Sequence, residues 1–84
     1  MEADYGEAMK KYAVVVERGP HNYSAYVPDL PGCVTTGRSI EEIKVNIREA
    51  IELHLEGLME DGISAPDPTS LAIEVDVPAE ASLA

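Results

Sequence analysis

The stretch that most constrains the fold is residues 26–62, in which turn signals lead directly into helix-capping signals. Pro28 cannot donate a hydrogen bond to a neighbouring strand, so it ends or borders a strand. Pro31 and Gly32 suit the two central positions of a type II turn, because glycine accepts the positive φ that the second position requires. Local chemistry therefore predicts a strand, a tight turn and a second short strand.

A capped helix follows this turn. Ser39, with Glu42 three residues later, forms a capping box that satisfies two backbone amides at the start of a helix. The predicted helix runs from Ile40 to Asp61, because Gly62 supplies the left-handed residue that often ends a helix.

Several other segments are typical of strands. Tyr12–Glu17 is rich in β-branched residues and apolar on both faces, and Tyr23–Val27 follows it across a turn, which predicts a hairpin. Cys33–Thr36 comes directly after the type II turn. Leu71–Val77 alternates strictly between apolar and polar residues, which predicts a half-buried strand.

The elements follow the order β-β-β-α-β, which predicts an α+β fold of two layers. We expect a mostly antiparallel four-stranded sheet whose fourth strand is parallel to the first, with one long helix on one face. The 84 residues allow one small domain, residues 9–84, preceded by a tail or a short helix at residues 1–8. Since one helix covers only one face of a sheet, we also expect a homo-oligomer, either a dimer or a tetramer.

The charge limits the classes of partner. Sixteen acidic residues and six basic residues give a net charge of −10, which repels phosphate and argues against direct binding of nucleic acid. The same charge attracts a basic partner and speeds the encounter with it. The alternative is that the acidic excess only keeps the protein in solution.

The cellular compartment is predicted from cysteine usage and hydropathy. Cys33 is the only cysteine, so no disulfide forms within the chain, as is usual in the reducing cytoplasm. No apolar run reaches the roughly 18 residues of a membrane span. We therefore expect a cytoplasmic protein that makes no membrane contact.

The predicted helix has two contrasting faces. At 100° per residue, the apolar face expected to pack on the sheet consists of Ile40, Ile43, Ile47, Ala50, Ile51, His54 and Leu58. The opposite side carries the acidic face, our candidate for contact with a basic partner, which consists of Glu42, Glu49, Glu52, Glu56 and Glu60, with Leu53 beside them. A solvated face with scattered apolar residues is the alternative interpretation.

No combination of residues indicates catalysis, a cofactor or a metal. His21 and His54 lack a metal-binding spacing, and His54 is interpreted as a packed core residue, with a pH-sensitive contact as the alternative. Cys33 has no basic neighbour that would activate its thiol, so a structural role is predicted. Asp29 is interpreted as a turn former. We therefore expect no enzymatic activity.

One segment resembles a known family. The stretch Tyr26–Cys33, followed by Gly37–Ile43, resembles the HicB antitoxin family, and the resemblance extends over about Lys11–Pro78. The motif residues are Pro28, Asp29, Leu30, Pro31, Gly32 and Cys33. The resemblance implies a reduced ribonuclease-H-like fold that binds and blocks HicA, a small basic toxin that cleaves mRNA. Many members add a C-terminal DNA-binding domain, which we do not expect here.

Two functional hypotheses follow. In the first, the chain is a HicB-like antitoxin module that neutralises a small basic HicA-type toxin. In the alternative, it is a stand-alone oligomeric protein, an adaptor or a small-ligand module with a pocket near Pro28–Cys33. We do not expect nuclease activity, because ribonuclease-H-like nucleases hold metal ions on carboxylates of the central strands and Tyr12–Val16 carries none.

Overall fold

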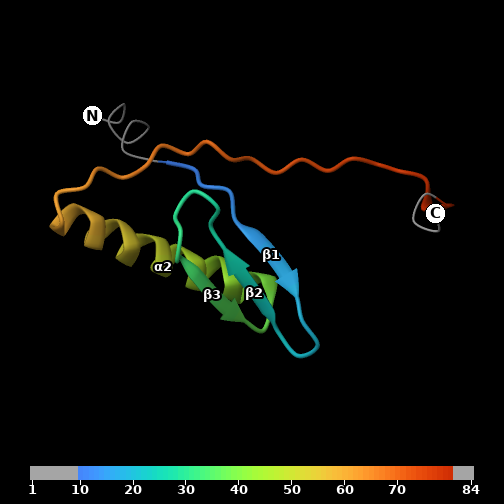
Figure 1. Ribbon diagram of the computed structural model, residues 1–84. Helices are drawn as coiled ribbons and strands as arrows, with labels where there is room; N and C mark the ends of the chain where they lie inside the picture. The colour runs from blue at the N-terminus through green and yellow to red at the C-terminus, as the bar shows by residue number, and fades with distance from the viewer. Residues whose placement is uncertain (1–9, 81–84) are drawn as a thin grey trace, which may run out of the picture.

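Three short strands and one long helix form the domain in the computed structural model, which describes residues 10–80 (Figure 1). In chain order, the elements are β1 (Val15–Arg18), β2 (Tyr23–Tyr26), β3 (Val34–Gly37) and α2 (Ile40–Glu60). The element predicted for residues 1–8 lies outside the described residues.

The sheet is antiparallel, with the strand order β1-β2-β3. Val16 lies opposite Ala25, and Ala25 lies opposite Thr35, so these residues share one face of the sheet. Tyr26 lies opposite Val34 on the other face, where both side chains are exposed. Because α2 packs on the first face only, the second face stays open, as the sequence predicted.

The loop between β2 and β3 is closed by its own hydrogen bonds. The Cys33 amide donates to the Leu30 carbonyl at 3.0 Å, and Gly32 has a φ of 87°. Both features match the predicted type II turn, in which the second central residue needs a positive φ. The Val27 amide also donates to the Cys33 carbonyl at 3.1 Å, and this bond joins the two ends of the loop.

The helix begins where the capping signals placed it. The Ser39 hydroxyl accepts a hydrogen bond from the Glu42 amide at 3.0 Å. The Glu42 carboxylate accepts one from the Arg38 amide at 2.6 Å, one residue earlier than in the standard capping box. The predicted capping box is therefore confirmed for the Glu42 amide only, because the reciprocal bond goes to Arg38, which lies before the N-cap, and not to Ser39.

The end of the helix is a Schellman motif. Gly62 has a φ of 74°, and its amide donates to the Met59 carbonyl at 3.0 Å. The Ile63 amide donates to the Leu58 carbonyl at 2.8 Å. The helix therefore ends at Glu60, one residue before the predicted end.

The core lies between the first half of α2 and the loop that joins β2 to β3. Its buried residues are Ala25, Val27, Leu30, Cys33, Ile43 and Ile47. The predicted apolar face of the helix is mostly correct, with three differences. Ile40 is exposed, Leu58 does not pack against the core, and Leu55, which was not predicted, does.

The predicted fourth strand is wrong for the described residues, because the sheet has three strands. Leu71–Val77 is extended but pairs with no strand, and Figure 1 shows it running past β1 and away from the domain. The first strand is also shorter than predicted and begins at Val15. Residues 10–12 instead contact residues 65–67 through side chains.

Candidate functional site

The acidic face of α2 lies in solvent. All of its glutamates are exposed: Glu42, Glu49, Glu52, Glu56 and Glu60. Leu53 is exposed beside them. The Glu42 carboxylate also accepts a hydrogen bond from the Arg38 amide at the start of the helix, so it has a structural role in addition to its charge.

The charges on this face are not neutralised within the domain. In the described part of the chain, the carboxylates of the four glutamates other than Glu42 accept no hydrogen bond and form no ion pair. The ion pair that residues 10–80 do contain joins Lys10 to Asp67. An exposed row of uncompensated carboxylates creates a negative field that steers a basic partner towards it.

A second surface feature is an apolar groove between β1 and α2, with a volume of about 910 Å³. No Cα atom of β1 lies within 8 Å of a Cα atom of α2, so these two elements leave space between them. The apolar side chains that line the groove include Val14, Val16, Ile47, Ile51, Leu55 and Met59. Sequence reasoning had placed a possible pocket at Pro28–Cys33 instead. In that loop Leu30 and Cys33 turn inward and fill the space.

The groove also gathers basic side chains. Lys10, Lys44 and Arg48 line it, together with the acidic Glu52. Three of the six basic residues of the chain therefore meet at one place in an otherwise acidic molecule.

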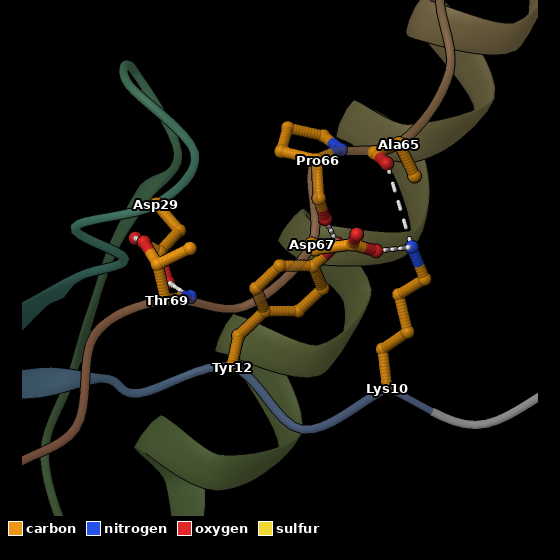
Figure 2. A network of polar contacts seen from close by, with 7 residues as sticks. All are labelled: Lys10, Tyr12, Asp29, Ala65, Pro66, Asp67 and Thr69. Carbon is orange, nitrogen blue, oxygen red and sulfur yellow. Dashed lines mark hydrogen bonds and ion pairs between the residues drawn. The ribbon is translucent and has the colours of Figure 1, made fainter.

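Asp29 in the β2–β3 loop connects distant parts of the chain (Figure 2). Its carboxylate accepts four hydrogen bonds, from the amides of Thr69 and Ser70 at 2.9 and 3.0 Å and from their hydroxyls at 3.0 and 2.9 Å. These bonds favour the charged form, with the Ser70 amide contributing most, and lower the pKa of Asp29 from 3.8 to about 2. We call this cluster of three residues the Asp29 clamp.

A second set of contacts lies beside the clamp. The Tyr12 hydroxyl donates to the Pro66 carbonyl at 2.6 Å, and the Lys10 ammonium pairs with Asp67 at 3.0 Å (Figure 2). The Lys10 ammonium also donates to the Ala65 carbonyl at 3.4 Å. These contacts fix residues 65–67 against residues 10–12, which precede β1, and the clamp fixes Thr69 and Ser70 against the β2–β3 loop.

Sequence reasoning missed this role of Asp29, which was interpreted only as a turn former. Its partners lie 40 and 41 positions away, and no local pattern links them. The one available signal was Thr69-Ser70, a pair of adjacent residues that each offer an amide and a hydroxyl donor. Within the family motif, Leu30 and Cys33 fill the core, while Asp29 makes the long-range contact.

The remaining candidate residues show no arrangement for catalysis. Cys33 is buried, and burial raises the pKa of its thiol, which disfavours the reactive thiolate. His54 is half-buried, and His21 is exposed. Within residues 10–80, no three His, Cys, Asp or Glu side chains are grouped so as to hold a metal ion. Within the same range, no helix is both long and apolar enough to span a membrane.

Comparison with protein families gives one match over most of the chain. The model of the HicB-like antitoxin of bacterial toxin-antitoxin systems matches residues 12–82. An uncharacterized 14.9 kDa protein of Haemophilus phage HP1 is 33% identical over 67 residues, which cover 80% of this chain and 50% of the phage protein. A UPF0150 protein of Helicobacter pylori is 48% identical over 50 residues, 60% of this chain and 69% of that protein. The chain thus spans half the length of the phage protein.

Solved structures show the same fold. A chain of the HicA3 and HicB3 toxin-antitoxin complex superposes with a TM-score of 0.62 at 30% identity, covering 71% of this chain and 70% of that one. The crystal structure of TTHA0281 from Thermus thermophilus superposes with a TM-score of 0.60 at 30% identity, covering 76% of this chain and 82% of that one.

Proposed function

Because this chain belongs to the HicB-like antitoxin family, whose model matches residues 12–82, we propose that it is an antitoxin module that neutralises a small basic HicA-type toxin. The observation that carries the proposal is the uncompensated acidic face of α2 on a protein of net charge −10. The similarity to a chain of the HicA3 and HicB3 complex supports the same role.

We propose that the module inhibits the toxin by covering the toxin's RNA-binding surface. A nuclease that binds RNA needs basic residues to contact phosphates. An acidic protein surface competes for the same residues, and long-range attraction raises the rate at which the two proteins meet. The contact on this chain is the acidic face with Leu53 as its apolar neighbour. The module itself carries out no chemistry, needs no cofactor and acts in the cytoplasm.

The direct test is co-expression with a HicA-type protein encoded next to this chain. We expect the toxin alone to arrest growth, and the chain to relieve the arrest and to co-purify with the toxin. The proposal would be contradicted if growth stayed arrested although the chain is folded and abundant. The absence of any small basic protein encoded beside it would contradict the proposal as well.

The contact surface is tested by charge reversal. We expect Glu56→Lys with Glu60→Lys to lower toxin affinity on the order of tenfold, or ~1.4 kcal/mol, and to flatten its salt dependence. The matched control is Glu17→Lys with Glu80→Lys, which makes the same change in net charge away from the helix. Equal losses in the two double variants, measured by calorimetry at two salt concentrations, would show that net charge alone matters and that α2 is not the contact.

The alternative function is a stand-alone module that binds a small ligand. The observation that favours it is the groove between β1 and α2, whose volume of about 910 Å³ falls within the roughly 300–1,000 Å³ that is usual for ligand pockets. This hypothesis predicts that a ligand raises the unfolding temperature of the wild type and that Ile51→Trp, which fills the groove, abolishes the shift. The antitoxin hypothesis predicts no such ligand.

A further inference from the structure

Residues 10–80 leave the segment Leu71–Val77 without cover. Its alternating apolar side chains are strongly exposed, at 79% for Leu71, 74% for Ile73, 71% for Val75 and 69% for Val77. The side chains between them are Ala72, Glu74 and Asp76. A strand with one apolar and one polar side is suited to a position in which one side is buried and the other faces water.

The Asp29 clamp leads this segment away from its own domain. Ser70, the residue directly before Leu71, donates two hydrogen bonds to Asp29. The segment therefore starts at the β2–β3 loop, and Figure 1 shows it running away from the sheet towards the C-terminus. The radius of gyration of 16.1 Å exceeds the ~12 Å expected for a compact chain of this length.

A complementary site for such a segment is present on the same molecule. Among residues 10–80, β1 is an edge strand, because it pairs with β2 on one side and with no strand on the other in the order β1-β2-β3. Next to this edge lies the apolar groove lined by Val14, Val16 and residues of α2. A strand added to β1 would place its apolar side chains in the groove and would protect an edge that otherwise invites uncontrolled pairing.

Charge complementarity identifies the occupant. The side chains that line the groove include three cations, Lys10, Lys44 and Arg48, and one anion, Glu52. Since Lys10 is already paired with Asp67 at 3.0 Å, the other two cations and Glu52 leave a local charge of +1. The segment carries Glu74 and Asp76 and no basic residue, a charge of −2. The net charge of −10 makes two copies repel each other, so the groove is where the acidic segment of a second copy meets the opposite charge.

We propose that Leu71–Val77 of one copy adds to the β1 edge of a second copy and fills its groove, and that the exchange is reciprocal. Each copy offers one segment and one groove, so two copies satisfy both and form a closed two-fold dimer. The groove and the acidic face of α2 meet at Glu52, whereas Glu56 and Glu60, the residues reversed in the toxin test, do not line the groove. A dimer without toxin binding, or toxin binding without a dimer, would separate this inference from the proposed function.

The first test is the mass of the full chain in solution, measured by sedimentation equilibrium. We expect a dimer for the wild type. Ile73→Asp places a carboxylate in the partner's groove, so the dimer dissociation constant should rise by about 100-fold or more. Ala72→Asp introduces the same residue one position earlier, on the water-facing side, and should leave the dimer intact. A monomeric wild type, or equal effects of the two variants, would overturn the proposal.

The second test distinguishes exchange from any other dimer contact. Val16→Asp damages the groove but leaves the segment intact, whereas Ile73→Asp damages the segment but leaves the groove intact. Each variant alone should be monomeric, with circular dichroism checking that it is folded. Mixed in equal amounts, they should form a heterodimer visible by native mass spectrometry, because one of the two exchanges is then undamaged. A mixture that stays monomeric would overturn reciprocal exchange.

Discussion

The Val27–Cys33 loop and the Leu71–Val77 segment differ in where their apolar side chains go. In the loop, Leu30 is 1% exposed and Cys33 is 3% exposed, and backbone hydrogen bonds close the loop on itself. In the segment, all four alternating aliphatic residues are exposed. The backbone of the loop is thus closed by residues a few positions away, with Asp29 as its long-range contact, whereas residues 10–80 bring no covering surface to the segment.

The largest expected effect comes from a large-to-small substitution made in each region. Leu30→Ala removes a fully buried side chain and leaves a cavity, so the free energy of unfolding should fall by ~2–5 kcal/mol. Ile73→Ala, measured in conditions under which the chain is monomeric, should change it by less than ~0.5 kcal/mol. Urea unfolding gives both values, and equal losses would mean that the segment is packed within its own monomer.

A smaller effect is expected from the glycine that shapes the loop. Gly32 has a φ of 87° and open space around its Cα atom, so Gly32→Ala should cost ~1–2 kcal/mol through backbone strain alone. Gly57 lies in the interior of α2 with no atom within 4 Å of an added Cβ, and Gly57→Ala should stabilise the protein by up to ~1 kcal/mol. Thermal unfolding of the pair tests the sign of each change. A stabilising Gly32→Ala would contradict the assigned turn.

The features that the sequence predicted correctly depend on neighbours in the chain. The turn at Pro31-Gly32 and the cap at Ser39 involve residues no more than a few positions apart, so their chemistry can be recognised in the linear sequence. The acidic face of α2 follows from helical periodicity, which is equally local. These parts of the fold and of the candidate site can therefore be predicted from the order of the amino acids alone.

The features that the sequence did not predict depend on distant contacts. The alternation in Leu71–Val77 indicated the extended conformation, but it contained no information on which edge the strand would join. Asp29 was interpreted as a turn residue, because nothing local links it to Thr69. The groove needs a gap between β1 and α2, which is set by how the helix crosses the sheet and not by either element alone.

The titration of Asp29 should have the smallest effect on global stability. It distinguishes the two regions most directly, because the Asp29 clamp holds the start of the Leu71–Val77 segment. Its pKa in the folded protein is about 2, below the ordinary 3.8, mainly because the Ser70 and Thr69 amides donate to its charged form. A lowered pKa in the folded state means that the clamp is complete above about pH 4 and is lost as the pH falls towards 2. Asp29 lies within the Val27–Cys33 loop, but the hydrogen bonds that close this loop join backbone groups that do not titrate, so the loop should keep its conformation over this range.

Carbon-detected NMR of the Asp29 carboxyl measures this titration directly, with amide shifts of Ser70 and Cys33 reporting on the two regions. We expect the Ser70 amide to move together with the carboxyl and the Cys33 amide to stay unchanged. Ser70→Ala with Thr69→Val removes both hydroxyl donors but keeps both amides, so the pKa should rise only part of the way towards 3.8. A wild-type pKa near 3.8 would mean that the clamp is open in solution, and the segment would then be free to fold back onto its own β1.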